Sequence, residues 1–411
     1  SAAEKTTLTF WHAMGGTNGE VLQQIVDDFN ASQDEIEIKA EYQGTYDDTI
    51  TKLKAAMQSD SGLPDVCQMY DVGTKFMYDS GAVIPVEDKF ESTGYDKSSV
   101  MEVISSYYTV DGKQYAMPFN VSTPMLYYNK DVFEAAGLDP ETPPTTYDEV
   151  LEDAKKIVES GAAPVGYSQA IYGWFFEQQL AGLGVTYGNN DNGRKEAVTA
   201  VDFDSNGGGL KVFDMWKKLY DSGYFEDYGT TTADTQTAFF SGQVGMIIES
   251  TAILKNAVDS SPFEVGTGYL PRIEQNDEGG VIIGGGSLWL TDTGNEANED
   301  AAWKFIEYIT TPDVQAKWSM GTGYFAINEK AYETDDMKAY LEENPNFETA
   351  INQLKDSPVN CNTAGVLSGV QTEARLTFNE IMPQVYDGKL TTQDAVDQLA
   401  ASVNKAIENY N

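Results

Sequence analysis

The sequence predicts an α/β protein of two lobes, and three observations support this fold class. Strand-like and helical apolar patterns alternate from the N-terminus, helical patterns dominate the middle of the chain, and strand-like runs return at residues 265–290. With 411 residues the chain is long enough for roughly two to four domains. It contains no internal repeat and no long flexible linker. We therefore expect two lobes joined by chain crossings rather than independent domains.

The first lobe is predicted from the order of its elements. Leu8 and Phe10 alternate in a short strand, and apolar residues at 21–29 recur at helical spacing. Residues 36–42 alternate with period two, residues 50–57 form a second helical pattern, and residues 65–70 form a third strand. Strands that alternate with helices in this way predict βαβ units and a mainly parallel sheet.

The second lobe is predicted to be rich in helix. Helical patterns occupy residues 147–159, 174–180 and 210–220, and a strand follows at 244–248. Strand-like runs at 265–270 and 281–290 come next, and the last helix follows a predicted capping box of Thr391 and Asp394. We assign residues 1–118 and 266–320 to lobe 1, and residues 119–265 and 321–411 to lobe 2.

The charge of the chain excludes several functions. It carries 65 acidic and 26 basic residues, a formal net charge of −39. Nucleic acid is excluded as a partner, because phosphate backbones require concentrated Lys and Arg. The single histidine, His12, excludes His-rich metal sites and most catalytic triads. The sequence contains no run of 18 apolar residues, so no membrane-spanning helix is predicted. The small, polar residues 1–7 are typical of a tether left after processing.

No metal or cofactor site is expected. Asp202, Asp204 and Asn206 match the first half of a calcium loop, but Phe213 stands where its bidentate Glu belongs. Cys67 and Cys361 make neither a disulfide framework nor a zinc set, and they either form one long-range bridge or stay as two thiols. The triplet 284–286 lacks the spacing of a nucleotide cradle and favours a close backbone approach to something small instead.

Polar and aromatic residues stand at the ends of the strand-like runs. Because ligands in open α/β sheets bind at the carboxyl ends of strands, their distribution along the chain favours a binding cleft between the lobes. The residues are Trp11, Tyr70, Asp71, Ser122, Thr123, Ser250, Thr251 and Tyr324.

Arg375 is a further candidate, because the chain has only two other arginines and this one lies in a stretch with few charges. Its planar guanidinium suits a carboxylate or a phosphate. Two interpretations stay open at this point. Arg375 either binds an anionic ligand or forms an internal pair with an acidic side chain.

Several segments together resemble the extracellular solute-binding proteins of ABC importers, and among them the glycerol-3-phosphate-binding branch. They keep their order from residue 10 to beyond Arg375. They are FWH at 10–12, YQGTY at 42–46, QMYDVGT at 68–74, PFNVSTPMLYYN at 118–129, AGLDP at 136–140, IIGGGSLW at 282–289 and TGY at 322–324. The resemblance implies a two-lobed periplasmic-binding-protein-like fold with hinge crossings, no enzymatic activity, and delivery of a small molecule to a membrane permease. It also implies a monomer outside the cytoplasmic membrane, held there by a lipid tether.

Carried over position by position, the resemblance implies a set of ligand-binding residues. Asp71 stands where the branch usually has Glu, Ser122 matches a serine of the second lobe, and Arg375 would anchor the anion. The full set is Tyr46, Asp71, Ser122, Trp174, Ser250, Thr251, Gly285, Tyr324 and Arg375.

The resemblance favours a small polyol phosphate as ligand, either glycerol-3-phosphate or a glycerophosphodiester such as glycerophosphocholine. The field of the acidic surface is no bar, because it decays over about 8 Å at physiological salt. A neutral mono- or oligosaccharide is the alternative, bound by stacking on Trp or Tyr rings. The competing class is a secreted hydrolase that uses two carboxylates, for which the sequence carries no recognisable nucleophile motif.

Overall fold

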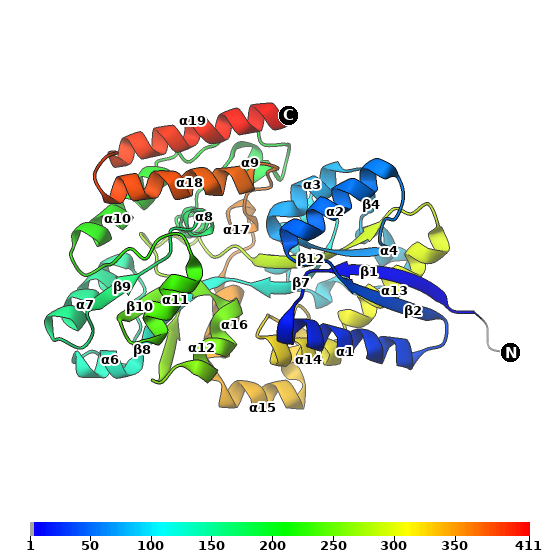
Figure 1. Cartoon of the computed structure of the whole chain (residues 1–411), viewed down its shortest axis with the longest axis horizontal. Coiled ribbons are helices and arrows are strands. Elements are labelled where there is room, and N and C mark those ends of the chain that lie inside the picture. The colour runs from blue at the N-terminus through cyan, green and yellow to red at the C-terminus, as the bar shows by residue number, and fades with distance from the viewer. Residues whose placement is uncertain (1–3) are drawn as a thin grey trace. The chain divides into compact units, whose positions relative to one another are not determined.

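Two units make up the computed structural model, which describes residues 4–411 (Figure 1). Unit 1 comprises the chain up to Ser122 together with Ile283–Glu343, and unit 2 comprises Thr123–Ile282 and Asn344–Asn411. The chain therefore passes between the units three times.

The sheet of unit 1 combines an early parallel part with one late strand. β2 (Ile36–Tyr42), β1 (Thr6–His12) and β3 (Val66–Tyr70) are parallel neighbours, as predicted. β12 (Gly284–Thr291) runs antiparallel to β3, to β4 (Val83–Ile84) and to β7 (Met117–Ser122). The sheet is therefore mixed rather than mainly parallel, because a strand from late in the chain completes it.

The helices of unit 1 cover both faces of this sheet. α1 (Gly16–Ser32) buries Leu22, Ile25, Val26 and Phe29, the apolar face that the sequence predicts. α2 (Tyr46–Ser59) begins with a capping box of Thr45 and Asp48 and lies on the opposite face from α1 (Figure 1). The remaining elements are α3 (Thr74–Asp79), α4 (Glu87–Thr93), α5 (Glu102–Ser105), β5 (Thr109–Val110), β6 (Lys113–Gln114), α13 (Glu296–Ile309), α14 (Pro312–Thr322) and α15 (Asp335–Glu343).

Unit 2 is built on a four-stranded sheet that is surrounded by helices. Its strands lie in the order β11 (Val265–Gly268), β8 (Pro124–Asn129), β10 (Val244–Ser250) and β9 (Val165–Ser168). The helices are α6 (Lys130–Ala135), α7 (Tyr147–Glu159), α8 (Gly173–Gly182), α9 (Asn189–Gly193), α10 (Gly208–Asp221), α11 (Thr232–Phe240), α12 (Leu254–Ser260), α16 (Pro345–Asp356), α17 (Cys361–Ala364), α18 (Gln371–Tyr386) and α19 (Thr392–Tyr410).

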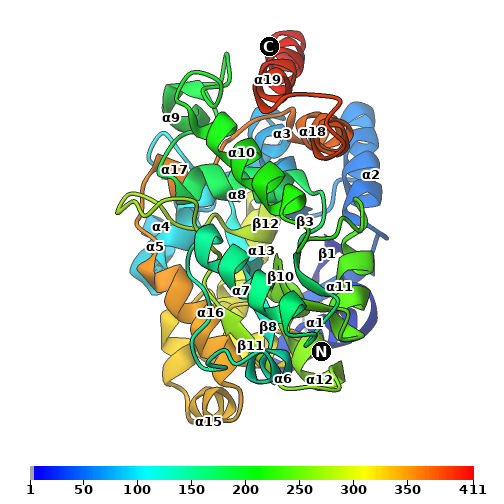
Figure 2. The ribbon, with the colours of Figure 1, turned by 90° about the vertical axis from the view of Figure 1, so that its left-hand side faces the viewer.

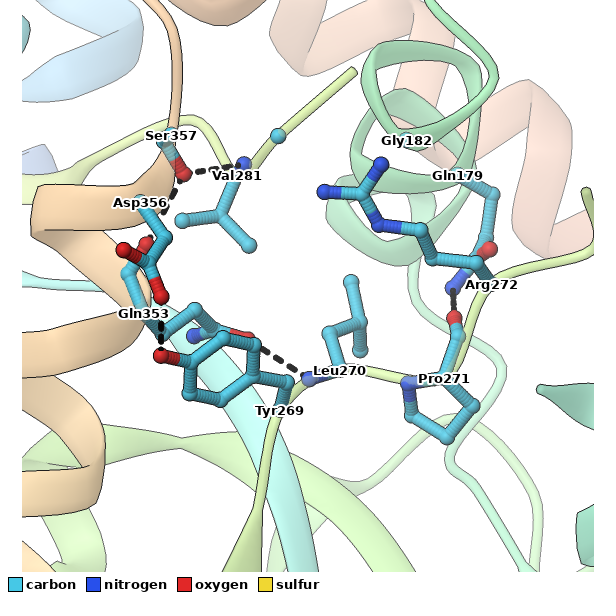
Figure 3. Close-up of a pocket in the computed structure, with 11 residues that line it drawn as sticks. Gln179, Gly182, Tyr269, Leu270, Pro271, Arg272, Val281, Gln353, Asp356 and Ser357 are labelled. Atoms are coloured by element: carbon cyan, nitrogen blue, oxygen red, sulfur yellow. Dashed lines mark hydrogen bonds between the residues drawn. The ribbon is translucent and has the colours of Figure 1, made fainter. Parts of the chain in front are cut away.

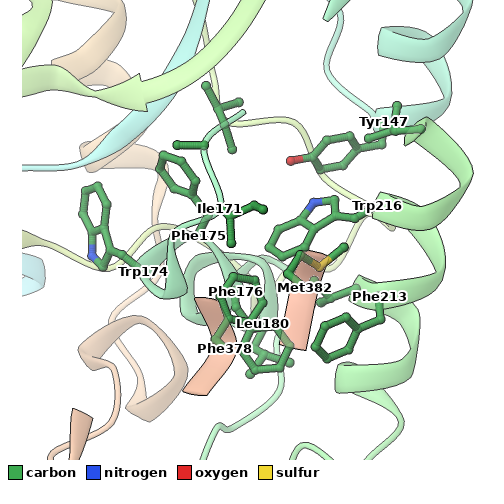
Figure 4. Packing of buried hydrophobic residues seen from close by; sticks show 14 of the residues in the cluster. Tyr147, Ile171, Trp174, Phe175, Phe176, Leu180, Phe213, Trp216, Phe378 and Met382 are labelled. Carbon is green, nitrogen blue, oxygen red and sulfur yellow. The ribbon is translucent and has the colours of Figure 1, made fainter. Parts of the chain in front are cut away.

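The core of unit 2 surrounds α8, all ten residues of which are buried. Phe176 packs among Phe213 and Phe378, and Trp216 packs against the same Phe378 ring (Figure 4). α18 and α19 lie side by side over this core (Figure 2). Because α8 is enclosed on every side, any charged residue on it must find its partner inside the unit.

The predicted lobe boundaries need three corrections. β12 pairs with β3 and β7, so the second crossing falls after Ile282 and not after residue 265. Phe325 bridges to Val121, and α15 packs with α14, so the segment 321–343 belongs to unit 1. The first crossing lies after Ser122, because β7 ends there, rather than after residue 118.

Two local predictions, the capping box and the state of the cysteines, can be compared directly with the structure. Only half of the predicted capping box is present at α19, where the Thr391 hydroxyl accepts from the Asp394 backbone N–H at 3.0 Å. Cys67 and Cys361 are both free thiols, and burial raises the pKa of Cys67 to about 12. Within residues 4–411 no group of three or more His, Cys, Asp or Glu side chains is placed to hold a metal ion.

Candidate functional site

The structure distributes the predicted ligand-binding residues over both units. Unit 1 carries Tyr46, Asp71, Ser122, Gly285 and Tyr324, and unit 2 carries Trp174, Ser250, Thr251 and Arg375. Ser122 is thus a residue of unit 1, not of the second lobe as predicted, because it is the last residue of β7.

In unit 1, Asn120 organises the candidate site, and sequence reasoning did not single it out. This residue of β7 is completely buried. Its amide nitrogen donates to the Tyr46 hydroxyl at 2.7 Å, and its amide oxygen accepts from Gln68 at 2.8 Å. The Gln68 oxygen in turn accepts from the backbone N–H of Ala13 at 2.8 Å. This chain of bonds links the residue that follows β1 to β3 and β7 and fixes the position of the Tyr46 phenol.

Aromatic rings flank this array. Tyr46 stacks on Tyr70 with ring centroids 5.3 Å apart, and Tyr324 stacks on Trp318 at 6.0 Å. Burial raises the pKa of Tyr46 and of Tyr324, so both phenols are neutral at physiological pH. A neutral phenol both donates and accepts, which is the behaviour that a sugar or polyol hydroxyl requires of its partner.

The stability of unit 1 should depend on this array. Asn120→Ala is expected to lower the free energy of unfolding by about 2–3 kcal/mol, because it removes two buried hydrogen bonds and leaves a small cavity. Tyr46→Phe removes only the bond between Asn120 and Tyr46, so it should cost about 1 kcal/mol. Urea unfolding of both variants checks this ranking. Equal losses would contradict the central position of Asn120.

Gly285 lies where β7 and β12 approach most closely. Its φ is +97°, and a Cβ at this position would lie 1.9 Å from the backbone oxygen of Asn120. A Cβ on Gly286 would lie 2.4 Å from the Asn120 amide oxygen. The close approach that requires glycine here is therefore with the Asn120 segment of the same sheet, rather than with something small as predicted.

Asp71 and Ser122 stand at the carboxyl ends of their strands. The Asp71 carboxylate accepts from the backbone N–H of Val72 at 2.9 Å, and its carbonyl accepts from the Tyr107 hydroxyl at 3.0 Å. These bonds hold Asp71 in the short 3-10 turn that follows β3. Ser122 pairs with Gly284 across β7 and β12 and is 5% exposed.

In unit 2, Ser250 is the last residue of β10 and Thr251 begins the 3-10 turn that follows it. The Ser250 hydroxyl accepts from the backbone N–H of Ala252 at 3.0 Å, and the Thr251 hydroxyl accepts from that of Thr123 at 3.0 Å. Both side chains therefore already have a structural role. The Thr123 hydroxyl is buried and has no hydrogen-bond partner within the described part of the chain. This hydroxyl could therefore form a hydrogen bond with a polar ligand group.

Glu249, next to these residues, is a buried carboxylate that sequence reasoning missed. Its oxygens accept from the Ser250 backbone N–H at 2.9 Å and from the Gln236 amide at 3.2 Å, both of them neutral donors. Burial raises its pKa to about 7. The signal in the sequence is one acidic residue directly after the apolar run 244–248.

Glu249 should make stability depend on pH. The pKa of Glu249 in the folded chain lies above the ordinary 4.5. Its favourable contribution to the free energy of unfolding is therefore complete below pH 4.5 and is lost as the pH rises toward 7. As the pH rises from 5 to 8, the stability of Glu249→Gln relative to wild type should therefore increase by on the order of 2 kcal/mol. Urea unfolding at both pH values measures this gain. The exposed Glu196→Gln should gain nothing, and a gain of the same size there would refute the assignment.

Arg375 forms an internal pair, one of the two arrangements that the sequence leaves open. Its Nε donates to Glu177 Oε2 at 2.8 Å and its Nη2 donates to Glu177 Oε1 at 2.9 Å. Both side chains are largely buried, at 15% and 9% exposure. The amide of Gln371 also donates to Glu177 Oε2, at 3.1 Å. Trp174, on the same helix as Glu177, is 5% exposed.

A separate cavity of about 30 Å³ lies in unit 2 (Figure 3). It is lined by Arg272, which donates to the carbonyls of Asn276 and Gly279, and by Tyr269, whose hydroxyl donates to Asp356 at 2.5 Å. None of the predicted ligand-binding residues lines it. A space of this size holds about one water molecule, which is too little for a sugar or a polyol phosphate.

Known proteins identify the class to which this architecture belongs. The model of the bacterial extracellular solute-binding proteins matches residues 24–349, and the chain belongs to this family. Its members are binding proteins of ABC transporters and not enzymes. Among residues 4–411 no helix is both long and apolar enough to cross a membrane.

Individual relatives differ in the ligands that their names give. The sn-glycerol-3-phosphate-binding periplasmic protein UgpB of Escherichia coli K12 is 31% identical over 417 residues, which cover 100% of this chain and 94% of the relative. The crystal structure of the cyclic alpha-maltosyl-1,6-maltose binding protein from Arthrobacter globiformis has a TM-score of 0.83 at 26% identity, covering 99% of this chain and 100% of that one. UgpB from Mycobacterium tuberculosis with glycerophosphocholine has a TM-score of 0.81 at 20% identity and covers 99% of each chain. The two-lobed solute-binding fold is thereby established.

Proposed function

We propose that this chain captures a small polyhydroxylated solute outside the cytoplasmic membrane, closes on it by a hinge motion and delivers it to an ABC permease. The favoured ligand class is a neutral mono- or oligosaccharide. The binding residues that we propose are the nine predicted ones together with Asn120 as a positioning residue. As the resemblance implies, we further propose a monomer held near the permease by a lipid tether.

The array around Asn120 carries this proposal. Its buried amides hold the neutral Tyr46 phenol in place beside two pairs of stacked rings, Tyr46 with Tyr70 and Tyr324 with Trp318. Asp71 adds one carboxylate, which accepts from hydroxyl groups. Neutral donors and acceptors next to aromatic faces suit a ligand with many hydroxyls and apolar C–H surfaces.

A polyol phosphate is the second candidate. Two observations favour it: the 31% identity to glycerol-3-phosphate-binding proteins over the whole chain, and an arginine at position 375. Under this alternative Arg375 would bind the phosphate, and Asp71 and Tyr46 would bind the glycerol hydroxyls. The carboxylate of Glu177 already occupies two of the guanidinium's donors, which is why we rank this ligand second.

The experiment is a thermal-shift screen of the full chain with neutral saccharides and phosphorylated polyols, followed by recovery of the ligand that stabilises it. A ligand that binds the folded chain but not the unfolded chain raises the melting temperature, and the increase grows with the ligand concentration. We expect a saccharide to stabilise the chain and to be recovered unchanged. Chemical conversion of the recovered molecule would refute a pure binding function, and stabilisation by phosphorylated polyols alone would favour the second candidate.

A further inference from the structure

We propose that Glu177 determines the ligand specificity of this chain: its two-point pair with Arg375 makes the site select uncharged, hydroxyl-rich solutes and reject phosphorylated ones. The inference rests on the solute-binding function proposed above and narrows its ligand class. Glu177 acts through Arg375, so it is a positioning residue rather than a ligand-binding one.

The pair uses the edge of the guanidinium that best recognises an anion. A phosphate or carboxylate is bound most strongly when two parallel N–H groups of one arginine point at its two oxygens. In this chain Nε and Nη2 of Arg375 point at Oε2 and Oε1 of Glu177, at 2.8 Å and 2.9 Å. A phosphate at the same edge would have to displace a carboxylate that already satisfies both donors.

Several contacts hold Glu177 in this position. The residue lies on α8, which is buried throughout, and Gln371 of α18 donates to the same Oε2 that receives Arg375 Nε. The helices approach closely here, since a Cβ on Gly173 would lie 2.6 Å from the Arg375 Cγ. Burial and then the nearby Glu177 carboxylate raise the pKa of Tyr187. Glu177 therefore cannot rotate away at low cost.

The face of the guanidinium has a partner as well. The Arg375 Cζ lies 5.8 Å from the ring centroid of Tyr172, within the range of a cation–π contact. A phosphate that approached Arg375 would also meet the negative charge of Glu177 at close range in a buried environment. Like charges in such a site repel strongly, because little water screens them. The pair thus both occupies the guanidinium and repels an anion.

The first arm of the test uses the wild-type chain. Calorimetric titration with sn-glycerol-3-phosphate and with inorganic phosphate should give no binding in the range below 1 mM, which on the affinity scale separates specific capture from weak association. Micromolar binding of either probe to the wild-type chain would overturn the proposal directly. This arm needs no variant and does not depend on knowing the natural ligand.

The second arm removes the charge of Glu177. Glu177→Gln keeps the size of the side chain, and it should increase the affinity for sn-glycerol-3-phosphate at least about tenfold, as expected for one new charge-assisted contact. Glu177→Met, of similar volume, is the second variant in case the amide misfolds. Glu373→Gln is the matched control, because it removes one negative charge from an exposed position on the same helix as Arg375. It should leave the affinity unchanged.

The outcomes separate this inference from the proposed function. A gain of phosphate affinity in Glu177→Gln or Glu177→Met, without a gain in Glu373→Gln, supports the inference even if no saccharide binds the wild type. Folded Glu177 variants that bind phosphate no better than wild type overturn it, whether or not a saccharide binds. An equal gain in Glu373→Gln also overturns it, since the effect would then come from the overall charge.

Discussion

Gly285→Val is expected to lower the free energy of unfolding by about 3 kcal/mol or more. Two costs combine at this position. The φ of +97° is one that branched side chains rarely adopt, which costs about 1–3 kcal/mol. The new Cβ would also lie 1.9 Å from the Asn120 backbone oxygen, so β7 and β12 would have to separate. Urea unfolding measures the loss.

Gly294→Val is the matched control for this prediction. Gly294 also has a positive φ, of +75°, but nothing lies within 4 Å of a Cβ there. It should therefore cost only the backbone strain, about 1–2 kcal/mol. The difference between the two variants isolates the contact with Asn120. If both variants lose the same stability, the close approach of β7 and β12 does not matter energetically, and the structural account of the glycine triplet is wrong.

Glu177→Ala is expected to cost about 3–5 kcal/mol, because it leaves the largely buried guanidinium of Arg375 without its carboxylate. The Gln371 amide also loses its acceptor. Part of the cost comes from the cavity that truncation opens in the core beside α8. Thermal or urea unfolding at neutral pH measures the loss.

A double variant separates the charge from the packing. Replacing both partners by apolar residues, as in Glu177→Leu with Arg375→Met, removes the unpaired charge and keeps most of the volume. We expect it to be clearly more stable than Glu177→Ala, and the corresponding cycle should show strong coupling between the two positions. A double variant that is as unstable as the sum of its singles would show that the two side chains act independently.

Much of the fold was predictable because its local signals agree with one another. The helix predicted at residues 147–159 coincides with α7, whose Tyr147, Val150, Ala154 and Ile157 are buried at helical spacing behind an N-cap at Thr146. The alternation in residues 36–42 coincides with β2. These patterns depend only on residues near in sequence, which is why they are legible without a structure.

The lobe boundaries were not predictable in the same way. They depend on strand pairing between segments far apart in sequence, such as the pairing of β12 with β3 and β7. Apolar alternation marks residues 281–290 as a strand but does not state which sheet they join. The assignment of Ser122 to the wrong lobe follows from the same limit.

The candidate site was predictable only in part. The resemblance supplied Tyr46, Gly285 and Tyr324, which the structure brings together around Asn120 in unit 1. Asn120 itself carries no signal, since a buried asparagine looks like an exposed one in a sequence. Glu177 could have been found, because it is the one charged residue in the otherwise uncharged helix at 173–182. The sequence does not indicate that Glu177 pairs with Arg375, because the two residues are 198 positions apart.

The parallel calorimetric titration of the full wild-type chain with maltotriose and sn-glycerol-3-phosphate tests the central claim most directly. The account predicts that a neutral saccharide binds with micromolar affinity or better, while the phosphorylated polyol does not bind, because Glu177 occupies Arg375. Tight binding of sn-glycerol-3-phosphate with no response to the saccharide would contradict the account. It would mean that Arg375 leaves Glu177 to bind the phosphate.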